Sequence, residues 1–151
     1  MIKIICLIVL CVAFVLLARG VRDYYAKRKN FSLDMLNLIK TISSEISFLK
    51  KDIKLICTNN SFGLADEMIN QYYRDNKVCI NYLSAHENQL LLDFMNSLGK
   101  QNVQGELGNL EYYKLKFEKF SSECESKYNT HGVLIYKLIM LAGLLLCIVF
   151  I

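Results

Sequence analysis

The sequence contains no proline and no tryptophan, and it has only seven glycines in 151 residues. Proline and glycine most often break helices and form the turns of β-hairpins. With so few of them, the chain offers few breaks between helices and almost no hairpin signals. We therefore predict an all-α protein whose helices are joined by short connections.

Residues that build catalytic or metal sites are also scarce. Of the two histidines, His86 and His131, neither has a metal-binding partner at helical spacing, and none of the six cysteines forms a C-x-x-C pair. The glycines lack the strand and the Gly-Lys-Ser/Thr sequence of a phosphate loop. We expect no enzymatic activity, no cofactor and no metal, and we interpret the cysteines as small buried hydrophobic residues.

Basic residues are scarce in the middle of the chain, although the formal net charge is +4. Residues 30–132 carry eleven basic and thirteen acidic side chains, which gives them a net charge of −2. A nucleic-acid-binding domain would present a basic face. We therefore expect no nucleic acid among the partners.

Long apolar runs are present at both ends. Residues 4–18 are apolar without interruption, and residues 1–18 would form a helix of about 27 Å, close to the bilayer core of about 30 Å. Residues 133–151 are interrupted only by Lys137, which can extend its amine to the membrane surface. We predict transmembrane helices at 1–18 and 133–151, with a helical domain at 19–132.

Three alternatives accompany this prediction. The first run could be a cleaved signal peptide, because a basic residue, an apolar run and small residues follow in that order. The second run could be the core helix of a soluble domain. Lys137 could also mark a functional charge inside the membrane.

Basic residues follow the first apolar run closely and predict the topology. We define the membrane-boundary basic cluster as Arg19, Arg22, Lys27, Arg28 and Lys29. Positive residues flanking a span favour the cytosolic side and can contact anionic lipid. We predict a cell-membrane protein with two spans, both termini outside and the central domain in the cytosol.

Apolar residues within the central domain recur at helical spacing. Ser32 is a candidate N-cap for a helix whose apolar stripe continues at steps of three and four. The stripe comprises Met35, Ile39, Ile42, Ile46, Leu49, Ile53 and Ile56. A second stripe comprises Leu110, Tyr113, Phe117, Phe120 and Cys124, on a helix that could continue into the second span.

Turn signals divide the sequence between these stripes. Thr58 to Gly63 predicts a turn, and Ala65 to Arg74 predicts a short helix. A further helix is expected from about Val78 to Leu98, with a possible break at Ser84 to His86. Gly99 to Gly108, with three glycines, is predicted to interrupt the helices. We expect the two long helices to pack antiparallel in a membrane-anchored helical bundle, and a homotypic coiled coil is the alternative.

Three segments carry short motifs. Leu36 to Phe48 contains a Glu45-Ile46 pair, Leu92 to Glu106 contains Leu98-Gly99 followed by Gly105, and Tyr136 to Ile151 is a leucine-rich run with Gly143. In these segments the chain resembles the stage III sporulation protein AB family of endospore-forming bacteria, whose first domain helix, helix end and closing span are similar. The chain departs from the pattern because it lacks a Pro-Leu after the first helix, and Asn102 and Glu106 replace Asp and Gln.

This resemblance implies a location and a function. It implies a component of the channel between mother cell and forespore, in the outer forespore membrane and facing the mother cell. The family's domain is similar to the cytoplasmic domains of secretion platforms. It therefore implies a non-enzymatic platform that docks the secretion-type ATPase, stage III sporulation protein AA, and other membrane components.

Two interpretations remain for the function and for the central loop. The alternative function is an unrelated membrane-anchored scaffold or signalling adaptor with the same two-span topology. We define the candidate partner loop by Gly99, Asn102, Gly105 and Glu106, and a plain connection between helices is the alternative.

Overall fold

The computed structural model describes the backbone of residues 2–49 and 52–150, and the side chains of residues 8–48, 52–146 and 148. Within these ranges all regular structure is helical, which confirms the all-α prediction. The elements are α1 (Ile2–Leu49), α2 (Ile53–Asn59), α3 (Ala65–Asp75), α4 (Ala85–Ser97), α5 (Val103–Lys127), the π-helical turn η1 (Tyr128–Gly132) and α6 (Val133–Phe150). Two compact units are present, one from 1–29 and 123–151 and the other from 30–122.

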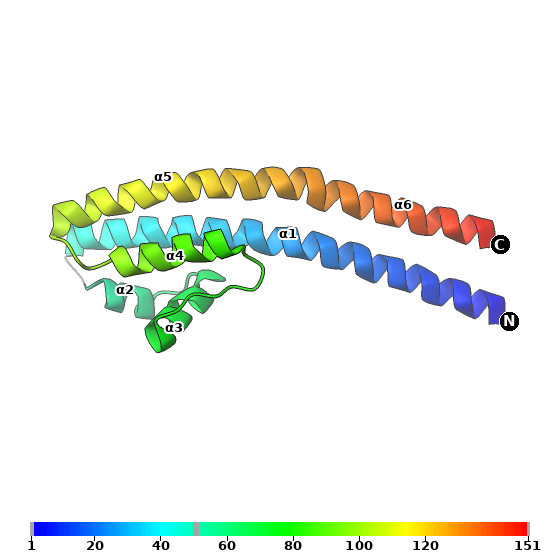
Figure 1. Ribbon diagram of the computed structural model, residues 1–151, viewed down its shortest axis with the longest axis horizontal. Coiled ribbons are helices and arrows are strands. Elements are labelled where there is room, and N and C mark those ends of the chain that lie inside the picture. Colours follow the sequence, from blue (N-terminus) through cyan, green and yellow to red (C-terminus); the bar gives the residue numbers. More distant parts are fainter. Residues whose placement is uncertain (1, 50–51, 151) are drawn as a thin grey trace. The chain divides into compact units, whose positions relative to one another are not determined.

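The first unit is a pair of antiparallel helices, formed by the beginning of α1 and the segment that ends with α6 (Figure 1). Glycines allow these helices to approach closely. A Cβ atom placed on Gly143 would lie 3.0 Å from Cβ of Phe14, and one placed on Gly132 would lie 3.1 Å from Cβ of Tyr25. The pairing of 14 with 143 and 25 with 132 therefore fixes the antiparallel register.

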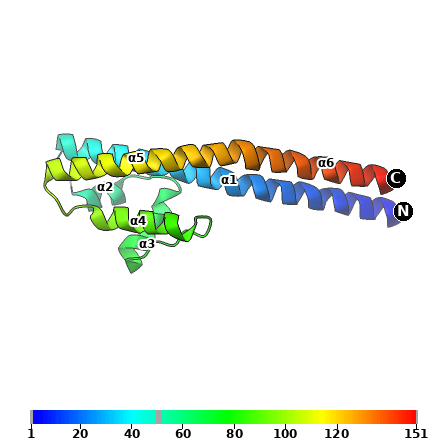
Figure 2. The same cartoon turned by 45° about the horizontal axis from the view of Figure 1, so that its top comes forward.

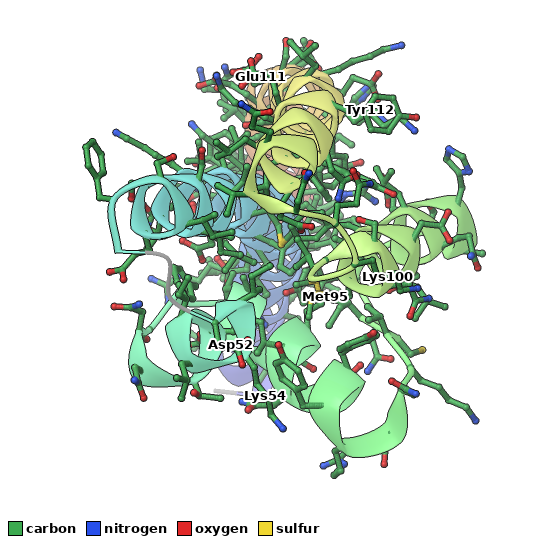
Figure 3. All side chains as sticks on the ribbon, turned by 90° about the vertical axis from the view of Figure 1, so that its left-hand side faces the viewer. Asp52, Lys54, Met95, Lys100, Glu111 and Tyr112 are labelled. Carbon is green, nitrogen blue, oxygen red and sulfur yellow. The ribbon has the colours of Figure 1, made fainter. Side chains whose placement is uncertain are left out.

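The second unit is a helical bundle in which the end of α1 and the beginning of α5 lie side by side, with α2, α3 and α4 on the same side of this pair (Figure 2). Its centre contains three aromatic rings in edge-to-face contact. The Phe94 ring lies 5.2 Å from that of Tyr113 and 5.6 Å from that of Phe117. Met95 points in among these helices, whereas Glu111 and Tyr112 lie on the outer side of α5 (Figure 3).

Most residues of the two predicted apolar stripes are buried, and all of these except Cys124, which belongs to the first unit, lie in this bundle. Met35, Ile39, Ile42 and Ile46 are all buried, as is every member of the second stripe from Leu110 to Cys124. The side chain of Leu49 lies outside the described residues. The second stripe is therefore confirmed, and so is the first from Met35 to Ile46; the helix of the second stripe continues through η1 into α6.

Ser32 is not an N-cap, so this prediction is wrong. It lies in the middle of α1, is fully buried, and its hydroxyl donates to Oγ of Ser121 on α5 at 3.2 Å. Serine at a helix start bonds the backbone of its own helix. Here its hydroxyl instead satisfies a buried polar group on the facing helix.

The first stripe does not lie on a single helix either. α1 ends at Leu49 and α2 begins at Ile53, with Asp52 as its N-cap accepting from the Lys54 amide at 3.1 Å. Ile53 is only partly buried, while Ile56 is buried. Apolar spacing alone did not reveal this break, because the stripe continues across it.

The predicted turn at 58–63 is confirmed from Asn60 onward, since Thr58 and Asn59 still belong to α2, and the helix that follows is confirmed. Gly63 has φ +62°, and α3 spans Ala65–Asp75. The carboxylate of Asp34 on α1 accepts from the Leu64 amide at 2.8 Å and so fixes the turn against the long helix. This contact joins residues thirty positions apart, and no local pattern indicates it.

The prediction that a helix starts near Val78 is wrong, and no break between two helical pieces exists at Ser84 to His86, because the only helix in this fully described segment starts at Ala85. α4 begins at Ala85 with a capping box, in which Ser84 and Glu87 bond each other's backbone amides. The preceding residues are held by Asn88. Its side-chain amide accepts from the Ile80 amide at 2.8 Å and donates to the Ile80 carbonyl at 3.2 Å.

The interruption predicted for Gly99 to Gly108 is shorter than expected. Gly99 has φ +74°, the left-handed conformation that ends many helices. However, α5 already begins at Val103, so Gly105 and Gly108 are helical. The side chain of Asn102 accepts from the Gly105 amide at 2.9 Å, and this contact starts the helix before the glycines can break it.

Candidate functional site

The membrane-boundary basic cluster lies on α1 in the first unit, where aromatic residues surround it. Arg19, Arg22 and Lys27 are exposed, and Arg28 and Lys29 are partly buried. The guanidinium of Arg22 lies 5.7 Å from the centre of the Tyr136 ring. Hydrogen bonding to Tyr128 raises the pKa of Arg22 further above its already high usual value.

Tyr128 brings two members of this cluster together. Besides its contact with Arg22, its ring lies 5.3 Å from Nζ of Lys29, which also forms an ion pair with Glu125 at 3.1 Å. Arg28 instead lies 6.0 Å from the Tyr24 ring and donates to its hydroxyl at 3.3 Å. Cations held over tyrosine rings are typical of a membrane surface, where both residue types are enriched.

These tyrosines were missed by sequence reasoning, although a signal was present. Tyr24 and Tyr25 follow the first apolar run, and Tyr128 and Tyr136 flank the start of the second. These tyrosines all lie at the same edge of the two paired apolar runs, and tyrosine is enriched at membrane–water interfaces. The π-helical turn η1 places His131 so that its ring stacks on that of Tyr25 at 6.3 Å, a contact that spacing alone could not reveal.

All four residues of the candidate partner loop are brought together at the start of α5 in the second unit. Asn102 caps the helix through Gly105, and its carbonyl accepts from the Glu106 amide at 2.8 Å. Oε1 of Glu106 accepts from the Gly99 amide at 3.0 Å. These contacts explain most of the loop as a connection between α4 and α5.

Glu106 has a second oxygen that this connection does not use. The side chain is 2% exposed, and Oε2 is buried with no hydrogen-bond partner among the described residues. A hollow of about 190 Å³ adjoins it, lined by Ile46, Asp52, Ile53, Gly99, Gln101, Val103 and Glu106. A buried acceptor without a donor is costly, so this atom is the unexplained feature of the loop.

A larger and somewhat more enclosed groove lies between α1 and α5 in the same unit. It has a volume of about 560 Å³ and is lined by residues that include Ile39, Lys40, Phe48, Leu110 and Lys114. Phe48 at its edge is 86% exposed. Apolar and charged side chains of both signs alternate along it, which gives this groove no distinct ligand chemistry.

Within the second unit, the clearest pKa shifts of acidic groups follow from desolvation of single side chains. Burial raises the pKa of the Cys57 thiol to about 11 and that of Tyr82 to about 12. Burial also raises the pKa of Tyr73, which is hydrogen-bonded to Cys57. Among the residues described, no group of three or more potential ligands could hold a metal ion.

The cysteines divide by position. Cys57 and Cys124 are buried, as predicted, but Cys79 is exposed and contradicts that prediction. It lies in the irregular segment before α4, where its amide donates to the side chain of Gln71. Cys11 is partly buried, and the side chains of Cys6 and Cys147 lie outside the described residues.

One helix among the described residues, Val103–Leu146, is long and apolar enough to cross a membrane, judged by length and composition. The predicted first span includes residues 1–7, whose side chains lie outside the described residues, so that span stays a prediction. The fold and these features define an all-helical protein with a candidate membrane helix near its carboxyl end.

Comparison with known proteins identifies the family. The family model of stage III sporulation protein AB matches residues 65–151, which is more than half of the chain. The chain belongs to the stage III sporulation protein AB family, and this membership implies a role in stage III of sporulation. No curated protein and no solved structure matches the chain.

Proposed function

We propose that the protein is a non-enzymatic membrane platform of the channel between mother cell and forespore. In this proposal residues 1–18 and 133–151 both cross the outer forespore membrane. The helical domain faces the mother-cell cytosol and docks the secretion-type ATPase, stage III sporulation protein AA, and other membrane components. Family membership supports the sporulation role, and the features below support the membrane platform.

The main support for a membrane location is the apolar outer surface of the first unit. Its two helices pack on glycines, while their large apolar side chains point outward. Leu16, Leu17, Leu141, Leu144 and Ile148 are each 58% to 63% exposed. Each such side chain favours the membrane centre by about 0.3 to 0.6 kcal/mol, and water would be a poor solvent for so continuous a surface.

Small residues at the contact between the two helices support the same environment. Gly143 and Gly132 face Phe14 and Tyr25, so the backbones approach to the limit that a Cβ atom would set. Membrane helices associate through such small-residue contacts, since lipid removes the hydrophobic driving force between them. Tyrosine is among the residue types enriched at the depth of lipid headgroups, and cytosolic flanks of spans are enriched in arginine, so the tyrosines and arginines of this unit support the same environment.

The second unit is a compact body of its own, which supports a docking role. It has its own aromatic core, and its surface near α1 and α5 exposes Phe48, Tyr112 and Leu115. A domain tethered close to the bilayer raises the local concentration of any partner that binds it. This geometry recruits a cytosolic motor without any chemistry by the platform.

Topology is tested with Cys79, whose side chain is exposed. An impermeant maleimide added to intact cells should leave Cys79 unlabelled, and permeabilisation should make it react. A Cys79→Ser variant gives the background from the other cysteines. Labelling of Cys79 from outside, or release of the protein from membranes by alkaline carbonate, would refute the two-span proposal.

The docking role is tested by capturing the ATPase with the full chain in lipid nanodiscs. We expect specific capture, and we expect deletion of the protein to arrest sporulation at the engulfment stage. Normal sporulation without the protein, together with its expression during growth, would favour the unrelated scaffold or adaptor instead.

A further inference from the structure

The hollow beside Glu106 combines a buried charge with apolar walls. Oε2 of Glu106 is buried without a partner among the described residues, and Asp52 contributes a second carboxylate to the lining. Ile46, Ile53 and Val103 supply apolar surface, and no described residue lining the hollow is basic. We propose that this hollow is a binding site for one lysine or arginine side chain of a protein partner.

The chemistry of the walls selects this ligand class. Lysine and arginine carry a cationic head on an apolar stem, so the stem can contact isoleucine and valine while the head reaches a carboxylate. A charged hydrogen bond to Oε2 would supply the donor that this atom lacks. A neutral donor could bond that oxygen but would leave its charge uncompensated, and an anionic side chain would repel it.

A bound metal ion fits the same hollow less well. Two carboxylates line it, and one oxygen of Glu106 is already used by the Gly99 amide. Divalent calcium takes six to eight oxygen ligands. The described residues provide no group of three acidic, histidine or cysteine side chains for such an ion.

Glu106 has two separable functions in this proposal. Oε1 braces the end of α4 through Gly99, and Oε2 binds the partner's cation. Glutamine retains the acceptor for Gly99 and nearly the same shape but removes the charge. Glu106→Gln therefore separates a merely structural role from a ligand-binding role.

The inference rests on the proposed function only for the nature of the partner, a protein docking on the cytosolic domain. The charge preference of the hollow is measured without that partner. The probe is n-butylguanidinium chloride, with n-butanol and sodium butyrate as controls for the apolar stem and for ionic strength.

The experiment uses the full chain in nanodiscs of zwitterionic lipid, labelled with ¹⁵N-glycine. Seven amide signals are expected, one for each glycine. Gly99, whose amide donates to Glu106, should shift progressively with n-butylguanidinium and much less with butanol or butyrate. Gly63, in the turn beside Asp34, should stay unmoved and so report an intact fold.

Two single variants and one double variant determine the result. Glu106→Gln should weaken the Gly99 response at least tenfold, while Glu118→Gln, which neutralises an exposed glutamate of α5, should leave it unchanged. An equal response in wild type and Glu106→Gln would overturn the proposal. A stronger Gly99 response to n-butylguanidinium after Lys50 and Lys51 are replaced by methionine would also overturn the proposal. It would mean that the chain's own lysines occupy the hollow in the wild-type protein.

The partner is tested separately, by ATPase capture with the same two variants. We expect Glu106→Gln to weaken capture and Glu118→Gln to preserve it. If the ATPase is captured but the Gly99 amide signal does not shift with n-butylguanidinium, the binding-site inference fails while the platform proposal stands. If Gly99 responds but no ATPase is captured, the platform proposal fails instead.

Discussion

Three glycines of the second unit should respond very differently to the same change, glycine to alanine. Gly63 and Gly99 both have positive φ, at +62° and +74°, whereas Gly108 is within α5. A Cβ atom on Gly63 would lie 2.6 Å from Oδ2 of Asp34. On Gly99 the nearest atom would be Cδ1 of Ile53 at 4.0 Å, and on Gly108 no atom outside its own helix lies within 4 Å.

The magnitudes follow from these environments. An alanine in the left-handed region costs about 1 to 2 kcal/mol, so Gly99→Ala should destabilise by that amount alone. Gly63→Ala must also displace the Asp34 carboxylate and break its bond to the Leu64 amide, which adds about 1.5 to 3 kcal/mol for a charged hydrogen bond. Gly108→Ala should stabilise by about 0.8 to 1 kcal/mol, the difference in helix propensity.

The assay is unfolding of the full chain in nanodiscs, followed by circular dichroism at 222 nm over a denaturant series. We expect the order of stability Gly108→Ala, wild type, Gly99→Ala, Gly63→Ala. Gly63→Ala combined with Asp34→Ala separates the two costs, because the clash disappears in the Asp34→Ala background. Equal losses for Gly63→Ala and Gly99→Ala would refute the assignment of the Asp34 contact to stability.

Two further predictions concern the core and alkaline pH. Phe94→Ala, which removes a buried ring contacting Tyr113 and Phe117, should cost about 3 to 5 kcal/mol by the same assay, whereas Phe48→Ala at an exposed site should stay within about 0.5 kcal/mol. Folding raises the pKa of Cys57 from 9.0 to about 11, because the folded protein favours the neutral thiol. The contribution of this thiol to the free energy of unfolding is therefore fully present below pH 9 and is lost as the pH rises through 11. Thermal melts between pH 8 and 11 should show the melting temperature falling as the pH rises, and Cys57→Ala should make this fall shallower. An unchanged slope in Cys57→Ala would contradict the assignment of the pH dependence to Cys57.

Patterns within one helix predicted much of this fold, because burial repeats at helical spacing. The stripes from Met35 to Ile46 and from Leu110 to Cys124 depend only on that repeat. Features that depend on a second element were missed. Ser32 resembles an N-cap locally but bonds Ser121 across the bundle, and only the three-dimensional packing reveals that partner.

The candidate site divides in the same way. Asn102 and Gly99 were recognised as loop residues because their types favour caps and left-handed turns. The interruption was predicted too long because Asn102 starts α5 ahead of Gly105, so a cap outweighed two glycines. The buried oxygen of Glu106 could not be predicted, since its environment is built by Ile46 and Asp52 from a distant part of the sequence.

Asn88 shows how a chain without proline forms an irregular connection. Its single amide pairs with both backbone groups of Ile80 and donates to the carbonyls of Leu83 and Ser84 at 3.4 and 3.1 Å. One side chain thus makes the pair of hydrogen bonds that a neighbouring strand would make in a hairpin. Aspartate at this position would replace the side-chain nitrogen with an oxygen. That oxygen would repel the three carbonyl groups to which the nitrogen donates, so a change of one atom would detach these carbonyl groups from α4.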